Sequence, residues 1–314
     1  MTPDDARDDP TGTQPMTMEL AHSAQQRRQE KRYWVSGLSR GVAAGFLAPY
    51  LILCGALIVY PLLRLIIFSL SSGRGIANFS SFFHNEAELR SLMTTVVDSI
   101  LVTVFVLLIG AFIAWRMRTS SSRFLKILLS IAIFVPLWMS AITKIYAFTI
   151  LFQRLGIINQ VLQSIGLIQV PVSWLYNQPI VIAGIVYQML PYGTLPLYVT
   201  FSLIDLDLVH ASESLGASRW YALRTVVAPL SLGGMLVTGV MVYMISLGYF
   251  LTPVLLGGAT SPFTASLISQ DIFTYYDVAD ASVSAVLLIA VAAITAFVAY
   301  KIGGKERLSR AVTA

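Results

Sequence analysis

The sequence predicts an all-α membrane protein with six transmembrane helices. Of its 314 residues, 56% are hydrophobic and only 12% are charged, whereas roughly 25% of the residues in an ordinary soluble domain are charged. The mean hydropathy is +0.73. The sequence lacks the alternating segments of about ten residues that are typical of membrane β-barrels. We therefore expect the spanning elements to be helices.

Six apolar runs are long enough to cross a membrane, because a helix of about 20 residues spans roughly 30 Å of hydrocarbon. We expect the spans near 43–68, 93–115, 124–148, 179–201, 230–256 and 281–302. The domain boundaries follow from them. We expect a partly disordered tail over 1–40, a transmembrane domain over 41–304 and a short tail over 305–314.

The lysine and arginine residues predict the orientation of the chain. Sixteen of the 21 lie on one side: six in the N-terminal tail, four within 116–126, two within 202–229 and four near the carboxyl end. Basic residues in short loops are concentrated on the cytoplasmic side of membrane proteins. Both termini and the 202–229 loop are therefore expected to be cytoplasmic.

Two outer segments, 69–92 and 149–178, are long enough to form short helices at the membrane surface. In the second, apolar residues recur at helical spacing, and two aromatic residues suit the membrane interface. These residues are Leu155, Ile158, Leu162 and Ile165, with Trp174 and Tyr176.

Several other classes of protein are excluded. The net charge of +5 and the isoelectric point near 9.3 do not predict a nucleic-acid partner, because the basic residues lie at membrane edges. Cys54 is the only cysteine and lies in the first apolar run, which excludes a disulfide within the chain. The three histidines, His22, His84 and His210, lie outside the spans, so no metal site is expected. No cofactor is expected in this chain.

The loop "HASESLGASRWYALRTVVAPL" between the fourth and fifth spans is unusually polar. Helical spacing predicts one helix over 205–214 and a second over 218–227. Gly216 can stop the first helix in a left-handed conformation, because it has no Cβ. Pro229 disfavours helix at Ala228, so the second helix should end there. By itself this pattern is also compatible with a solvated connector.

The loop resembles the coupling motif of binding-protein-dependent ABC transporter permeases. That motif reads Glu-Ala-Ala, three residues, Gly, nine residues, then Ile, any residue, Leu and Pro. Ala211, Gly216 and Pro229 match it. The chain departs from it at four positions, with His210 for Glu, Ser212 for Ala, Val226 for Ile and Ala228 for Leu. The segments "PLWMSAITKIYAF" and "SLGYFLTPVLLGG" also resemble permeases of the polyamine-type subgroup.

The resemblance implies a type I ABC importer permease in the bacterial inner membrane, embedded in the lipid bilayer. It also implies a second permease subunit, identical or different, a periplasmic solute-binding protein and a cytoplasmic ATPase dimer that holds ATP and Mg²⁺. The chain itself has no G-x-x-x-x-G-K-[ST] phosphate loop. The residues expected to couple to the ATPase are His210, Ala211, Glu213, Gly216, Arg219, Trp220, Leu223, Arg224 and Pro229.

These coupling residues have different expected roles. Trp220 and Leu223 would supply apolar anchors, and Gly216 would set the angle between the two helices. Glu213, Arg219 and Arg224 would set the register through charge complementarity. Glu213 could also partly replace the acid that the family has at His210.

Polar residues near the middle of the fourth and fifth spans are together candidates for a translocation pathway, although helix packing is the favoured explanation for any one of them. They are Tyr187, Gln188, Tyr192, Tyr243, Ser246 and Tyr249. Asp98 and Lys144 are ionisable residues within spans. They could pair with each other, or Lys144 could extend to the interface.

The subgroup resemblance suggests a polyamine substrate, and similar permeases serve amino-acid-like, opine-like or anionic solutes. The outer acids Asp271, Asp277 and Asp280 are expected to form part of the docking surface for the binding protein. A secondary transporter driven by an ion gradient is the main alternative. It should show internal repeats or acids at mid-membrane depth, whereas Asp98 is peripheral.

Overall fold

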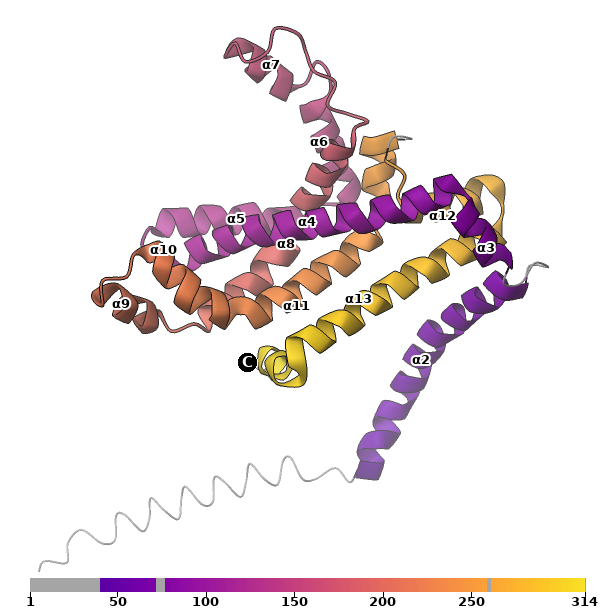
Figure 1. Ribbon diagram of the computed structural model, residues 1–314, viewed down its shortest axis with the longest axis horizontal. Coiled ribbons are helices and arrows are strands. Elements are labelled where there is room, and N and C mark those ends of the chain that lie inside the picture. The colour runs from indigo at the N-terminus through magenta and orange to yellow at the C-terminus, as the bar shows by residue number, and fades with distance from the viewer. Residues whose placement is uncertain (1–39, 72–76, 259–260, 314) are drawn as a thin grey trace, which may run out of the picture. The chain divides into compact units, whose positions relative to one another are not determined.

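The computed structural model describes residues 40–71, 77–258 and 261–313, and these residues form helices and connecting loops without any strand (Figure 1). The expected tail over residues 1–39 lies outside the described residues. The chain forms two compact units, Met1–Arg64 and Leu65–Ala314. The described part of the first unit belongs to α2 (Arg40–Ser71), which contains Pro49 and Pro61 and continues into the second unit.

The second unit contains the remaining helices. Those of the α type are α3 (Ala77–His84), α4 (Glu86–Thr119), α5 (Arg123–Trp138), α6 (Ala141–Phe152), α7 (Ile157–Ser164), α8 (Gln178–Ser202), α9 (Leu206–Ser214), α10 (Arg219–Ala222), α11 (Ala228–Leu247), α12 (Thr264–Gln270) and α13 (Val278–Thr313). Three π-helical turns join them, η1 (Leu223–Val227), η2 (Pro253–Gly257) and η4 (Asp271–Tyr275).

Within the described ranges 40–71, 77–258 and 261–313, six helical segments are long and apolar enough to cross a membrane, as the sequence predicts. They are Leu47–Leu70, Glu86–Thr119, Ala141–Ser164, Gln178–Ser202, Arg219–Leu247 and Val278–Lys301. Five of them overlap most of their predicted ranges, although the fifth begins and ends about ten residues earlier than the predicted 230–256. The third segment, Ala141–Ser164, shares only residues 141–148 with its predicted range of 124–148.

The prediction of one continuous third span over 124–148 is wrong. α5 ends at Trp138, Met139 is extended with φ −83° and ψ 139°, and α6 begins at Ala141. α6 leaves α5 at a steep angle in Figure 1. Pro136 lacks a backbone N–H and lies in the last turn of α5, where it weakens the helix. With 16 residues, α5 extends about 24 Å and is shorter than the hydrocarbon layer.

The outer segment after α6 is organised by the buried side chain of Asn159. Its amide donates to the carbonyl oxygens of Arg154 at 3.1 Å and Val172 at 2.8 Å, and its Oδ1 accepts from Trp174 Nε1 at 3.0 Å. Trp174 is half-buried, and its ring packs edge-on against Phe152. The predicted short helix is present as α7, whose residues also form the end of the apolar segment Ala141–Ser164, which is interrupted between α6 and α7.

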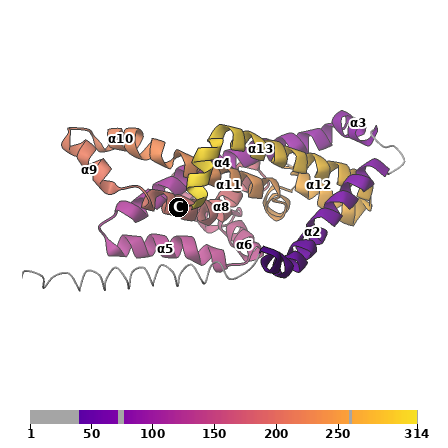
Figure 2. The ribbon, with the colours of Figure 1, turned by 90° about the horizontal axis from the view of Figure 1, so that it is seen from below.

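The core of the second unit lies between α4, α8 and α11. Val106 of α4, Ile185 of α8 and Val242 of α11 are fully buried in one apolar cluster. Gly193 lets α8 approach α4 closely, because a Cβ at this position would collide with Val106. Small residues serve this purpose commonly in membrane helices. Figures 1 and 2 show these helices running side by side along the long axis of the unit.

Candidate functional site

The coupling loop, residues 205–229, begins with a capped helix and a tight turn. Asp205 Oδ1 accepts from the Asp207 backbone N–H at 2.9 Å, so the carboxylate caps the start of α9. After Ser214 the chain turns at Gly216, where φ is +90°. A Cβ on Gly216 would meet no atom within 4 Å, so glycine is needed here for its backbone conformation and not for its size. This confirms the predicted left-handed turn at Gly216.

The second helix of the loop continues directly into the fifth span. Ser218 Oγ accepts from the Tyr221 backbone N–H at 3.3 Å and caps α10. The chain then passes through η1 into α11 without a break. The predicted helix end at Ala228 is therefore wrong. The Ala228 N–H reaches back five residues to the Leu223 carbonyl, and this wider π turn admits Pro229 at the start of α11.

A buried apolar cluster attaches the coupling loop to the bundle. Val209 of α9, Ala222 of α10 and Val227 of η1 are buried together with Phe201 at the end of α8. Leu223 packs partly against the same cluster. Leu223 was expected to be a docking anchor, and in the structure it is half-buried and helps to hold the loop on the bundle.

The apex of the loop exposes three large apolar or aromatic side chains. Leu215 is 90% exposed, Trp220 74% and Tyr221 60%. Sequence reasoning identified Trp220 and missed Leu215, although an apolar residue directly before a turn glycine was the available signal. An open hollow of 580 Å³ lies beside these residues. Its lining consists of Ser212, Leu215, Gly216, Ala217, Ser218 and Tyr221.

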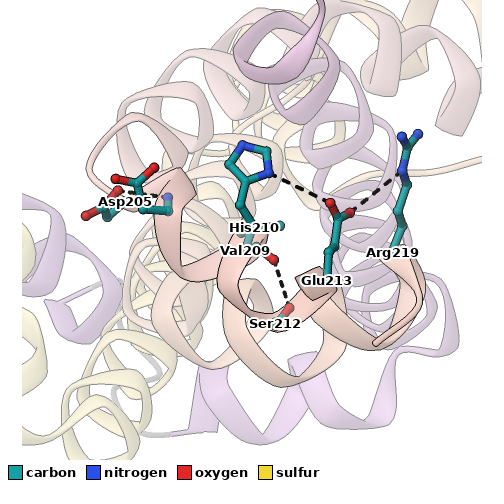
Figure 3. Close-up of polar contacts among 7 residues, drawn as sticks. Asp205, Val209, His210, Ser212, Glu213 and Arg219 are labelled. Carbon is teal, nitrogen blue, oxygen red and sulfur yellow. Dashed lines mark hydrogen bonds and ion pairs between the residues drawn. The ribbon is translucent and has the colours of Figure 1, made fainter. Parts of the chain in front are cut away.

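Glu213 connects the two helices of the loop electrostatically (Figure 3). Its Oε2 lies 3.8 Å from His210 Nδ1, and its Oε1 lies 3.7 Å from Arg219 Nε. The His210 and Arg219 side chains are 68% and 93% exposed. Ion pairs at such positions stabilise by about 0–1 kcal/mol. The carboxylate of Glu213 is thus engaged inside the loop and is a poor substitute for an acid facing a partner.

The remaining predicted coupling residues lie on the surface of the loop. Ala211, Arg224 and Pro229 are exposed. Arg224 forms no ion pair with any residue in the described ranges 40–71, 77–258 and 261–313. Its guanidinium is therefore available to a partner.

Three of the six candidate pathway residues are buried in the core. Gln188 is 2% exposed and donates to Thr252 Oγ1 at 2.7 Å. Tyr243 is 6% exposed, and Ser246 is fully buried and donates to the Val242 carbonyl at 2.8 Å. These three side chains support helix packing within this chain.

The other three pathway candidates are tyrosines nearer the surface. Tyr187 is half-buried and stacks on Phe148, with 6.0 Å between the ring centroids. Tyr192 is 42% exposed. Tyr249, half-buried in the loop after α11, lies close enough to Tyr192 for an electrostatic interaction. Tyr187, Tyr192 and Tyr249 are therefore nearer the surface than the other three candidates.

Asp98 and Lys144 do not form an ion pair with each other. Asp98 is fully buried and its Oδ1 accepts from Gln178 Nε2 at 2.6 Å. Lys144 is 8% exposed and has no ion pair among the described residues. Within the same described residues, no cluster of three or more His, Cys, Asp and Glu side chains could hold a metal ion.

The acidic residues of the outer loop before α13 lie near one another. Asp277 Oδ1 accepts from the backbone N–H groups of Ala279 at 3.0 Å and Asp280 at 3.1 Å, which caps α13. Burial, together with the negative charges of Asp280 and Asp277, raises the pKa of Asp271 to about 6. The segment therefore presents a concentrated negative charge at neutral pH.

Comparison with known proteins identifies one family. The family described as binding-protein-dependent transport system inner membrane component matches residues 92–303. The spermidine/putrescine transport system permease protein PotB of Salmonella typhimurium is 27% identical over 179 residues, which are 57% of this chain and 62% of the relative. The matched part is thus less than two thirds of that relative. PotB of Haemophilus influenzae is 28% identical over 196 residues, covering 62% of this chain and 68% of the relative.

A solved structure shows the same fold. It is a bacterial alginate ABC transporter in complex with a periplasmic protein that binds an alginate pentasaccharide. The likeness has a TM-score of 0.73 at 17% identity and covers 89% of this chain and 97% of the compared chain. The two chains therefore share one arrangement of helices.

Proposed function

Because the chain belongs to the family of binding-protein-dependent transport system inner membrane components, we propose that it is a permease subunit of an ATP-driven importer. The chain is a multi-pass membrane protein with six apolar helices. It forms one half of the pathway for a small solute. The observation that carries this proposal is the coupling loop, whose base is buried in the bundle while Leu215, Trp220 and Tyr221 stay exposed at its apex. An apolar apex of this kind is typical of a docking surface.

The partner at this apex is a cytoplasmic ATPase dimer, which binds ATP and Mg²⁺. The loop transmits motion because α10, η1 and α11 are continuous, and α11 packs against α4, α8 and α13. Closure of the ATPase dimer displaces the loop as a rigid body and rotates α11 with it. This rotation opens the pathway to alternate sides of the membrane.

The remaining partners are a second permease subunit and a periplasmic solute-binding protein. Asp271, Asp277 and Asp280 on the outer side form part of the surface that receives the binding protein, because their concentrated charge steers a basic partner. Reversal of these three charges should slow uptake without changing ATPase co-purification. Unchanged uptake in that variant would exclude this docking role.

The solute is a polyamine or a similar amine. The relatives named above are called spermidine/putrescine permeases, and the exposed ring of Tyr192, which lies close to Tyr249, suits a cation. Aromatic faces attract ammonium groups by about 0.5–1 kcal/mol at exposed sites. Amino-acid-like, opine-like and anionic solutes are the alternatives.

The test is uptake by the complex reconstituted from its native membranes into proteoliposomes. Labelled putrescine, glutamate and octopine are compared as substrates. We expect saturable, ATP-dependent uptake of putrescine. Tyr192→Leu should raise KM about three- to fivefold, and Tyr192→Phe, which keeps the aromatic face, should stay near wild type. Uptake of glutamate or octopine without uptake of putrescine would overturn the polyamine assignment.

A further inference from the structure

We propose that the ATPase surface that receives this coupling loop presents carboxylates to it. The inference rests on the proposed function, because it concerns the partner of the coupling loop. It names the chemistry of that partner, a cleft with an apolar floor and an acidic rim. The loop supplies the complementary groups, which are an apolar apex and a cationic margin.

The cationic margin consists of Arg219 and Arg224, whose side chains are exposed, and the exposed His210 lies on the other side of Glu213. Glu213 is the one acid between them, and it is only 34% exposed. The other acids of the loop, Asp205 and Asp207, lie at the opposite end of α9 from Gly216. At neutral pH the apex therefore carries net positive charge.

The geometry of Glu213 disfavours a cation from the partner at this place. Both carboxylate oxygens face neighbours in the loop, His210 on one side and Arg219 on the other (Figure 3). A cation from the partner would have to displace these contacts and would approach the guanidinium of Arg219. A carboxylate can instead reach the free guanidinium of Arg224 and the terminal nitrogens of Arg219. Guanidinium and carboxylate groups form short paired hydrogen bonds.

The apolar apex indicates a protein cleft in preference to the membrane surface. Leu215 and Tyr221 line the 580 Å³ hollow, and Trp220 is exposed next to Tyr221 in the chain. An apolar centre with a charged rim is typical of protein interfaces. Basic and aromatic residues together can also bind anionic lipid. However, α9 and α10 project beyond the ends of α4 and α5 along the long axis of the unit in both views (Figures 1 and 2). This position directs the apex away from the plane of the bilayer.

The first test measures rebinding of the ATPase subunit, stripped from the native complex, to nanodiscs that contain the permease pair. His210→Glu places an acid where the family motif has one, and it adds a negative charge beside Glu213. We expect His210→Glu and Arg224→Glu each to weaken binding about tenfold. Arg123→Glu is the matched control, because Arg123 is an exposed arginine outside the coupling loop, and it should leave binding unchanged.

The second test identifies the carboxylate directly. Arg224→Lys supplies an amine, and a carbodiimide joins an amine to a carboxylate only when the two are in contact. We expect an amide bond between the lysine at position 224 and an aspartate or glutamate of the ATPase, identified by mass spectrometry. This readout does not depend on the affinity of the variant.

The outcomes separate the inference from the function on which it rests. The proposal of an acidic rim would be wrong if His210→Glu bound the ATPase as tightly as wild type or more tightly, or if no ATPase carboxylate were cross-linked. Neither result would contradict the proposed importer function. Wild-type nanodiscs that bind no ATPase while the loop binds anionic vesicles would overturn the proposed function as well.

Discussion

Gly216→Ala isolates the conformation of the coupling loop from its side-chain contacts. The Gly216 backbone has φ +90° and an added Cβ would meet no atom within 4 Å. The variant therefore introduces conformational strain without a clash. A left-handed conformation costs an alanine about 1–2 kcal/mol, and this lowers the population of the native turn about 5- to 30-fold.

The assay for Gly216→Ala is ATPase rebinding together with ATP-driven uptake at subsaturating ATPase. We expect ATPase rebinding and uptake each to fall by up to about 5- to 30-fold, because only the native turn at Gly216 presents the apex to the partner. Gly166→Ala is the matched control, since Gly166 has φ +74°, has no atom within 4 Å of an added Cβ and lies in the outer loop. Equal loss in both variants, or normal uptake by Gly216→Ala, would refute the reasoning.

Three further predictions concern stability in detergent, measured by thermal unfolding. Gly193→Ala should cost about 1–3 kcal/mol, because the new methyl group collides with buried Val106, whereas Gly248→Ala, with ordinary contacts, should cost less than 1 kcal/mol. Asp98→Asn should stabilise the protein by about 2 kcal/mol, because it removes a buried charge. The asparagine keeps a side-chain oxygen that can accept from Gln178. A loss of stability would contradict this prediction. The pKa of Asp271 is raised to about 6, so its ionisation opposes folding above that pH, and stability should rise as the pH falls from 7 towards 4. Asp271→Asn should abolish this rise in stability between pH 7 and 4. At pH 7 it should increase the free energy of unfolding by about 0.5 kcal/mol, and the effect is this small because the carboxyl group is partly exposed to solvent.

The number of spans follows from the sequence because hydrophobic length is a strong signal. The break between α5 and α6 does not, because the residues on both sides are equally apolar and hydropathy cannot locate it. Pro136 and Ser140 were the only local signals, and prolines are common within membrane helices, as in α8. At Pro229 the sequence predicts a helix end that is absent, because a π turn before the proline keeps the helix continuous.

The sequence predicts those features of the coupling loop that depend on the local backbone conformation. It does not predict those that depend on packing between helices. The requirement for glycine at position 216 comes from backbone sterics and is visible in the sequence. The inward packing of Leu223 and the pairing of Glu213 with Arg219 depend on how α10 lies against α9 and the bundle. Helical periodicity does not predict how one helix packs against another. For the same reason it does not predict that Gln188, Tyr243 and Ser246 are buried in the core.

The most direct test of the central claim is the energy source of uptake in proteoliposomes that contain the permease pair and its ATPase. We expect uptake to require ATP hydrolysis, to persist after an ionophore collapses every ion gradient, and to fail in a Glu213→Arg, Arg219→Glu double variant that remains folded. Uptake that needs no ATPase and stops when the ion gradient is removed would contradict the account. The coupling loop would then be a solvated connector of a secondary transporter.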